Sequence, residues 1–253
     1  MSSPPATMLR VSGLTVGYGE DPVIEGIDLE IAEGDFVSLV GPSGSGKTSI
    51  LRVVTELLVP LAGVVELDAP VRDVGFLFQD DALLPWRTVR ENVALGLRIR
   101  EVPAAAIDEQ VEHWLARLGL AGYEGRYPGQ LSGGQRKRVA IAQVLALKPR
   151  LLLMDEPFAS LDAIVRTRIT QELLDWVERE HLTVLLVTHD LEEAISASDV
   201  VYVLGHGPRA TIQARHVVDI PRPRRLLESR RHPTFGPLVQ QLWTELSTEP
   251  PRR

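Results

Sequence analysis

The sequence predicts an α/β fold with a central β-sheet covered on both faces and antiparallel strands near the N-terminus. Three observations carry this prediction. Continuous apolar runs such as Leu151–Met154 and Val184–Val187 are typical of strands that are covered on both faces. A glycine-rich segment connects a strand pattern to a helix pattern in the first quarter of the chain. Two segments near the N-terminus alternate between apolar and polar residues, as half-buried antiparallel strands do.

The alternating segments are Leu9–Val16 and Val23–Ile31, and together they form the predicted antiparallel subdomain. The strand Phe36–Val40 follows and ends in the glycine-rich segment. Beyond that segment, apolar residues recur at helical spacing until Pro60, namely Ile50, Leu51, Val54, Leu57 and Leu58. The central unit is therefore a strand, a glycine-rich loop and a helix.

The second half of the chain alternates between helices and strands. A strand is predicted at Val74–Phe78, and residues 86–148 are mostly helical. One apolar helix face in that stretch consists of Ile107, Val111, Trp114, Leu115 and Leu118. A helix around Ile169 lies between the two buried strands and gives a βαβ crossover. Val200–Leu204 supplies a further strand.

The composition is ordinary for a globular protein with a substantial core. Of the 253 residues, 44% are hydrophobic and 24% are charged, and the mean hydropathy is +0.02. The longest apolar runs have strand length, so we expect no transmembrane segment, and no signal-peptide pattern opens the chain. The absence of cysteine excludes disulfides and thiolate metal sites.

The charge is acidic overall but uneven. A formal net charge of −7 argues against broad nucleic-acid binding, which requires a basic surface. One stretch departs from this balance and carries Arg209, Arg215, Arg222, Arg224, Arg225, Arg230 and Arg231. We interpret it as a solvated, partly flexible segment, with a contact to lipid headgroups or a partner protein as the alternative.

The glycine-rich segment matches the pattern G-x-x-x-x-G-K-[ST] between a strand and a helix. Its glycines let backbone N–H groups turn toward phosphates, and the helix N-terminus adds its positive dipole end. Lys47 is predicted to reach the outer phosphates and the Thr48 hydroxyl to hold Mg²⁺. The alternative is a flexible loop without a ligand. The predicted nucleotide-binding residues are Gly41, Pro42, Ser43, Gly44, Ser45, Gly46, Lys47, Thr48 and Ser49.

Two adjacent carboxylates, Asp155 and Glu156, follow the apolar strand Leu151–Met154. Strand ends are where α/β sheets place ligands. We expect Asp155 to act through Mg²⁺ and Glu156 to orient the water that attacks the phosphate. Two adjacent acidic residues are also common at the start of a helix. The functional interpretation of this pair therefore depends on its coexistence with the glycine-rich loop.

The segment Leu131–Gln135, with the sequence Leu-Ser-Gly-Gly-Gln, precedes a predicted helix. A serine and two glycines at this point offer a second backbone-amide site for an anion. The alternative is a simple helix N-cap with glycine beside it.

In their order along the chain, these motifs resemble the Walker A, signature and Walker B motifs of ABC-transporter ATPases, a branch of the P-loop NTPases. The resemblance runs from about Leu9 to Pro223. Further family marks match four residues: Tyr18 for adenine stacking, Gln79 for Mg²⁺ contact, Asp162 in the D-loop and His189 for the γ-phosphate.

The resemblance implies an ATPase that uses ATP and Mg²⁺, with Glu156 and His189 as catalytic residues. It implies an ATPase domain over residues 8–230 with a P-loop NTPase core. That core has a mixed sheet, an antiparallel β subdomain and an inserted helical signature subdomain at about 86–150. Residues 1–7 are expected to be disordered and 231–253 to form a short C-terminal tail. Two chains are expected to pack head to tail, so that ATP lies between Lys47 of one copy and the signature loop of the other: Ser132, Gly133, Gly134 and Gln135.

The segment Asp80–Asn92, the motif Asp155–Asp162 and Pro221–Arg224 resemble the ATPases of nitrate, sulfonate, taurine and bicarbonate importers. That likeness implies separate transmembrane permease subunits, an extracytoplasmic solute-binding protein and a position on the cytoplasmic face of the membrane. The solute, expected to be a small anion or sulfonate-like compound, is not specified further. The second ATPase subunit is expected to be another copy of this chain, with a paralogue as the alternative.

Two positions depart from the family pattern. Gln143 stands where relatives usually have arginine, and Lys137 replaces a common glutamine. Neither is predicted to touch the phosphates.

Two other functions compete with the transport motor. A soluble ABC ATPase acting on nucleic acid or ribosomes usually has coiled-coil insertions or two cassettes in one chain, and this acidic sequence has neither. A metabolic P-loop kinase would explain Gly41–Thr48 but not Leu131–Gln135. We therefore expect no nucleic-acid partner.

Overall fold

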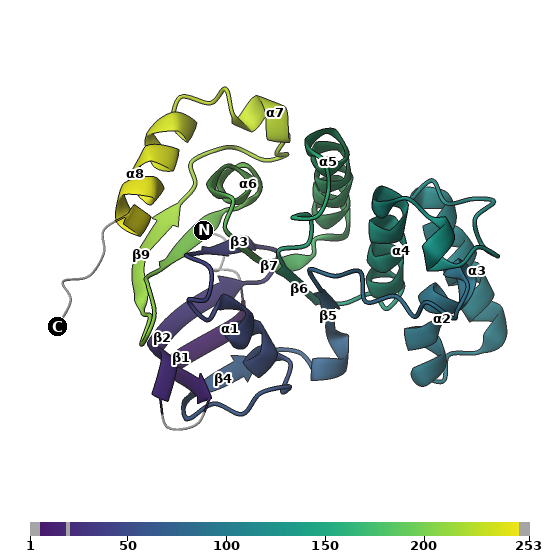
Figure 1. Cartoon of the computed structure of the whole chain (residues 1–253), viewed down its shortest axis with the longest axis horizontal. Coiled ribbons are helices and arrows are strands. Elements are labelled where there is room, and N and C mark those ends of the chain that lie inside the picture. Colours follow the sequence, from purple (N-terminus) through teal and green to yellow (C-terminus); the bar gives the residue numbers. More distant parts are fainter. Residues whose placement is uncertain (1–5, 19–20, 248–253) are drawn as a thin grey trace.

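The computed structural model describes residues 6–18 and 21–247 and confirms the predicted α/β fold. An antiparallel sheet has the strand order β2-β1-β4, with bounds Asp21–Ala32, Thr7–Tyr18 and Ala62–Leu67. A mixed sheet has the order β5-β6-β7-β3-β8-β9, with bounds Val74–Leu77, Leu151–Asp155, Thr183–Thr188, Phe36–Val40, Val200–Leu204 and Ile212–Val217. In Figure 1 the antiparallel sheet lies at the lower left of the mixed sheet.

Helices cover the mixed sheet, and α2, α3 and α4 form a separate group at the right of Figure 1. The helices are α1 Lys47–Val54, α2 Val89–Ile99, α3 Ala104–Arg117, α4 Gly133–Leu145, α5 Ala163–Glu180, α6 Leu191–Ala197, α7 Leu226–Ser229 and α8 Phe235–Ser247. Short 3₁₀ turns occupy Val71–Asp73 and Pro128–Gln130. No described helix combines the length and apolar composition that crossing a bilayer requires.

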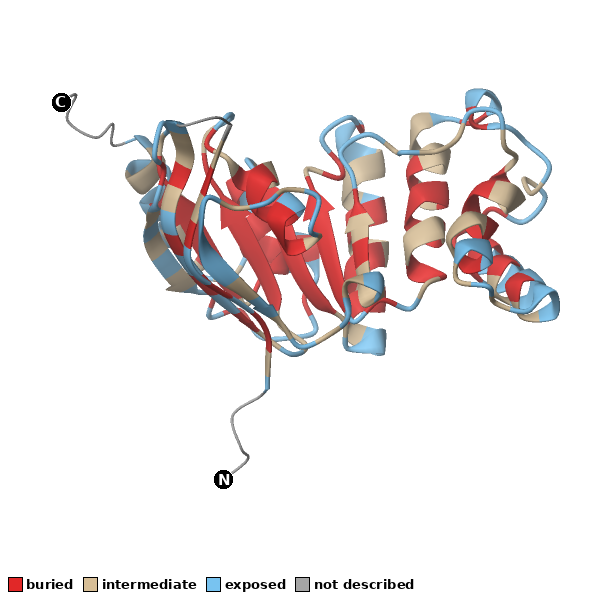
Figure 2. Ribbon diagram, turned by 90° about the horizontal axis from the view of Figure 1, so that it is seen from below, coloured by how far each residue is buried: buried red, intermediate tan, exposed pale blue. Residues whose placement is uncertain are grey.

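Strands β3, β6 and β7 are buried along their whole length, which explains why their sequences are continuously apolar (Figure 2). Alternate residues of β6 face opposite cores. Leu151 and Leu153 join the core shared with α1 and the antiparallel sheet, whereas Leu152 and Met154 join the core shared with α4 and α5. The sheet is therefore the wall between two hydrophobic cores.

Parallel pairing aligns the carboxyl ends of these strands. Val40 at the end of β3 pairs with Thr188 at the end of β7, and Asp155 at the end of β6 pairs with Val187. The segments that follow the three strands consequently begin at one edge of the sheet, which is where α/β folds place ligands.

The structure corrects the predicted end of one helix and adds elements that were not predicted from the sequence. The helix after the glycine-rich loop ends at Val54, well before Pro60, because Glu56 has a left-handed φ of 59° and Leu57 N–H bonds back to the Arg52 carbonyl at 2.8 Å. Leu57 is 67% exposed, so its assignment to the apolar helix face from the spacing was wrong. Strands β4 and β9 and helix α8 also went unpredicted.

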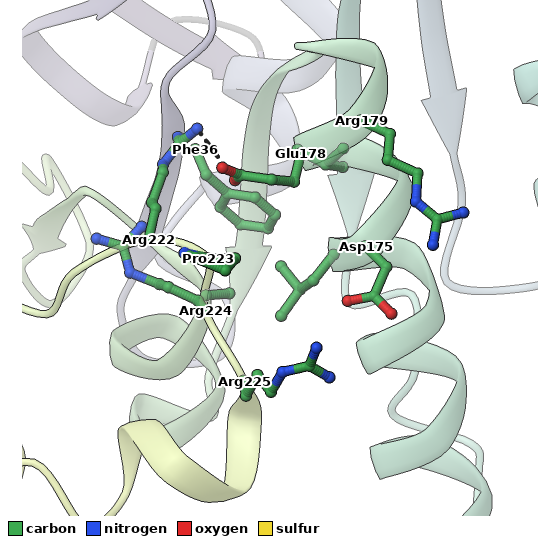
Figure 3. A pocket seen from close by; sticks show the side chains of 11 residues that line it. Phe36, Asp175, Glu178, Arg179, Arg222, Pro223, Arg224 and Arg225 are labelled. Carbon is green, nitrogen blue, oxygen red and sulfur yellow. Dashed lines mark hydrogen bonds and ion pairs between the residues drawn. The ribbon is translucent and has the colours of Figure 1, made fainter.

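Part of the arginine-rich stretch is structural. Arg224, which is buried, donates to Asp199 at 2.7 Å, and Arg222 also bonds Asp199 and lies 3.4 Å from Glu178. Figure 3 shows Arg222, Arg224 and Glu178 around a small cavity between α5 and the segment before α7. Burial alone would raise the pKa of Asp199, but the two guanidinium groups hold that pKa below its usual range. The stretch is therefore fixed to the sheet at these positions.

We predict that Asp199→Asn lowers the free energy of unfolding by about 3 kcal/mol, because it leaves the buried Arg224 without its counter-charge. Urea titration followed by circular dichroism measures the change. Glu66→Gln is the control, since Glu66 forms an exposed pair with Arg10, and it should cost less than about 1 kcal/mol. Equal effects of the two substitutions would contradict this account.

Candidate functional site

The loop Gly41–Gly46 turns sharply between β3 and α1, and its glycines are sterically required. Gly46 has a φ of 96°, and a Cβ placed there would lie 2.5 Å from the Ile24 side chain. A Cβ on Gly41 would lie 2.8 Å from the Leu204 carbonyl oxygen. The backbone therefore takes a course that larger residues would prevent, and it leads directly into the N-terminus of α1.

Lys47, the first residue of α1, turns back over this loop. Its Nζ donates to the carbonyl oxygens of Gly41 at 2.8 Å and Pro42 at 2.7 Å. The side chain is buried, and burial lowers its pKa, while the nearby Glu156 and Asp155 carboxylates raise it. A cation enclosed by backbone at a helix N-terminus is suited to bind phosphate oxygens.

Thr48 and Asp155 meet across the edge of the sheet. The Thr48 hydroxyl donates to the two Asp155 carboxylate oxygens at 2.9 and 3.0 Å. Burial raises the pKa of Asp155, and the hydrogen bond from Thr48 opposes that rise. A hydroxyl and a buried carboxylate at one point are oxygen donors of the kind that Mg²⁺ prefers, so these residues fit that ion.

Glu156 and His189 also come together, because one directly follows β6 and the other directly follows β7. The His189 Nδ1 lies 2.9 Å from a Glu156 carboxylate oxygen. Glu156 has a positive φ of 42°, and its backbone N–H donates to the Val187 carbonyl at 2.8 Å, so neighbouring strands fix its backbone. A half-exposed histidine and a carboxylate in contact can orient or polarise a water molecule beside a phosphate.

Gln79 lies on the exposed loop after β5, and its side chain hydrogen-bonds to no other described residue. Its backbone carbonyl accepts a bond from Lys137 Nζ at 3.1 Å. Lys137 is fully buried and also pairs with Asp81 at 2.9 Å. The sequence drew attention to this lysine only as a departure from the family pattern, whereas it fastens α4 to the Gln79 loop.

The signature segment forms a separate site. Ser132 caps α4, because its hydroxyl accepts from the Gln135 N–H at 3.3 Å and the Gln135 side chain accepts from the Ser132 N–H at 2.9 Å. A Cβ on Gly134 would lie 2.8 Å from the Val165 side chain, so glycine allows α4 and α5 to approach closely.

A cavity of about 370 Å³ opens beside this cap. Its described lining combines the signature segment Ser132–Gln135 with the D-loop Ser160–Asp162, and it includes no residue of Gly41–Ser49. Asp162 caps α5 through a 3.0 Å bond from the Val165 N–H. One copy therefore keeps its two predicted phosphate sites apart. The side chain of Tyr18 lies outside the described residues.

Two residues that contact the segment around His189 were missed in the sequence analysis. Glu193 accepts from the Thr188 hydroxyl at 2.8 Å, directly before His189, and Arg166 lies 3.7 Å from Asp190. The spacing Asp190-x-x-Glu193 is a helix-start pattern that could have indicated the first of them.

Comparisons with known proteins agree with this geometry. A protein-family model described as ABC transporter matches residues 24–159. The aliphatic sulfonates import ATP-binding protein SsuB 2 of Streptomyces avermitilis is 43% identical over 238 residues, which cover 94% of this chain and 90% of that protein. The bicarbonate transport ATP-binding protein CmpC of Synechococcus elongatus is 41% identical over 89% of this chain. This chain spans 35% of that relative's length.

Solved structures show the same fold. The dimeric structure of a bacterial ABC transporter cassette has a TM-score of 0.74 and 30% identity, covering 85% of this chain and 100% of its own. The same cassette is also known in a post-hydrolysis state bound to ADP and Pi. The molecule is thus an ATP-binding cassette by fold. The chain belongs to the ABC transporter family.

We predict that Glu193 lowers the stability of the folded state as the pH rises. Burial raises the pKa of its carboxyl group from 4.5 to about 7. The folded state holds this proton more tightly than the unfolded chain, so the stabilisation is complete below about pH 4.5 and is lost as the pH rises through 7. Glu193→Gln keeps the neutral form and should gain stability over the parent as the pH rises, by up to about 3 kcal/mol.

Urea unfolding between about pH 5 and pH 8 measures this difference. Glu192→Gln, at the exposed neighbouring position of α6, is the matched control for loss of a carboxylate. A constant offset between the parent protein and Glu193→Gln over this range would refute the assignment.

Proposed function

We propose that this chain is the ATP-hydrolysing motor subunit of an ABC importer. The observation that carries the proposal is the separation of two anion sites on one chain: the Lys47 loop on one side and the Ser132 cap on the other. The cavity beside the Ser132 cap is lined by no described residue of the Lys47 loop, so the two sites do not form one enclosure within a single copy. Two copies packed head to tail would bring the Lys47 loop of each against the Ser132 cap of its partner.

In this arrangement each residue has a chemical task. The backbone N–H groups of Gly41–Gly46 and the Lys47 ammonium bind the β- and γ-phosphates of ATP. Thr48 and Asp155 would hold Mg²⁺, with Gln79 as a further ligand, and the ion would neutralise charge that develops on the phosphates. Tyr18 would stack on the adenine.

Glu156 would orient the attacking water for in-line displacement of the γ-phosphate, and His189 would contact that phosphate while its Nδ1 stays on Glu156. Ser132, the glycines after it, Gln135 and Asp162 would complete the site from the second copy. ATP binds the closed pair better than the open pair, and only that difference in affinity can close it. Hydrolysis removes the γ-phosphate bridge and lets the copies separate.

We infer the membrane partners from the relatives, whose names include bicarbonate, sulfonate and sulfate import ATP-binding proteins. The substrate class is accordingly a small anion. Separate permease subunits would contact the segment Asp80–Asn92, in which Trp86 is 71% exposed. Tryptophan side chains are enriched at protein–protein interfaces. An extracytoplasmic solute-binding protein would deliver the anion, and the ATPase would sit on the cytoplasmic face.

We predict that Glu156→Gln retains ATP binding but lowers the hydrolysis rate by at least about a hundredfold, because the amide cannot act as a base toward water. With ATP and Mg²⁺ the variant should elute from size-exclusion chromatography as a dimer. Glu109→Gln, an exposed change on α3, is the control and should hydrolyse ATP as the parent does. A Glu156→Gln protein that stays monomeric with ATP and turns over normally would overturn these roles.

A further inference from the structure

Arg166, in the first turn of α5, contacts two loops that belong to different phosphate sites. Its Nη2 donates to the carbonyl oxygens of Leu161 at 3.1 Å and Ala159 at 3.4 Å, both in or beside the D-loop. Its Nη1 lies 3.7 Å from a carboxylate oxygen of Asp190. The guanidinium therefore bridges the D-loop and the residue that follows His189.

The Asp190 side of this bridge is rigid. The Asp190 side chain caps α6 by accepting from the Glu193 N–H at 3.0 Å, and the Asp190 N–H donates to the Thr188 hydroxyl at 3.1 Å. That hydroxyl in turn donates to Glu193 at 2.8 Å. The backbone on both sides of His189 is thus held by hydrogen bonds, so a displacement of Asp190 carries His189 with it.

The contacts form a closed ring. From Glu156 the chain runs directly into the D-loop, with the Ala159 N–H bonded to the Glu156 carbonyl at 3.3 Å. Arg166 connects the D-loop to Asp190, and His189 returns to Glu156 through the 2.9 Å contact. Arg166 is the long-range member of this ring. Its Nε hydrogen-bonds to no described residue, so its terminal nitrogens carry the contacts.

We propose that Arg166 is a positioning residue that sets the orientation of His189 according to the position of the D-loop. The D-loop lines the cavity beside Ser132, which serves the partner's nucleotide in the proposed function, on which this inference rests. Arg166 consequently connects two parts of one copy. One is the signature side, which completes the partner's nucleotide site, and the other is the Glu156–His189 pair, which acts on the nucleotide bound by the same copy. Occupancy of one site would then govern the geometry of the other.

The test uses Arg166→Gln, Arg166→Lys and Asp190→Asn in the full chain. Asparagine caps a helix as aspartate does, so Asp190→Asn removes the charge while keeping α6 capped. We expect Arg166→Gln and Asp190→Asn each to lower kcat for ATP by about tenfold and to leave KM within about twofold, because misplaced catalytic groups reduce turnover more than binding. Arg166→Lys should restore part of the rate.

The double variant Arg166→Gln with Asp190→Asn should be no slower than the slower single variant, since both changes break one connection. Arg179→Gln, near the other end of α5, is the matched control and should leave both constants unchanged. Thermal unfolding of every variant separates lost folding from lost positioning.

The outcomes distinguish this inference from the proposed function. Arg166→Gln and Asp190→Asn proteins that turn over at the parental rate, or whose rate losses multiply in the double variant, would overturn the role of Arg166. In the Glu156→Gln background, Arg166→Gln should still form the ATP-dependent dimer. Failure of Glu156→Gln alone to dimerise would count against the motor function itself.

Discussion

Everything at the candidate site depends on the parallel register of three buried strands. Because β3, β6 and β7 end at the same edge, the Lys47 loop, the Asp155–Glu156 pair and His189 begin within contact of one another although they are far apart in the sequence. A shift of one residue in β6 would turn Asp155 to the opposite face and separate it from Thr48. The apolar residues of the strands therefore serve the chemistry as directly as the polar residues at their ends, since two cores hold the sheet in this register.

The edge of the sheet holds charge under conditions that disfavour it. Lys47 and Asp155 are both largely removed from water, which lowers the pKa of the amine and raises that of the carboxyl. Hydrogen bonds from Thr48 to Asp155 and from Lys47 to the loop carbonyls compensate part of that cost. Groups held in place before a ligand arrives need little reorganisation when it binds, and this favours stabilisation of the charge that develops during phosphoryl transfer. Glu156 is fixed in the same way, because its backbone N–H donates to the Val187 carbonyl of β7.

Much of this arrangement could be predicted from the sequence, and the reasons for the exceptions are physical. Buried strands such as Phe36–Val40 have a continuous apolar pattern, and the glycine loop and the Ser132 cap have local spacings that require no tertiary information. Strand β9 has no such pattern, because it is specified by antiparallel pairing with β8 and only half buried. The roles of Lys137 and Arg166 were equally hidden. A lysine or arginine on a helix is most often a solvated residue, and only the fold reveals that these two reach the Gln79 loop and the D-loop.

The central claim is that a complete nucleotide site needs two copies of the chain. Mixing two inactive variants tests it most directly: Lys47→Ala, which disables the phosphate loop, and Ser132→Arg, which blocks the signature cavity. A mixed pair contains one site in which the intact Lys47 loop faces an intact Ser132 cap. The account predicts that the mixture hydrolyses ATP although neither variant does so alone. Hydrolysis by either variant alone, or a mixture as inactive as its parents while mixed pairs demonstrably form, would contradict it.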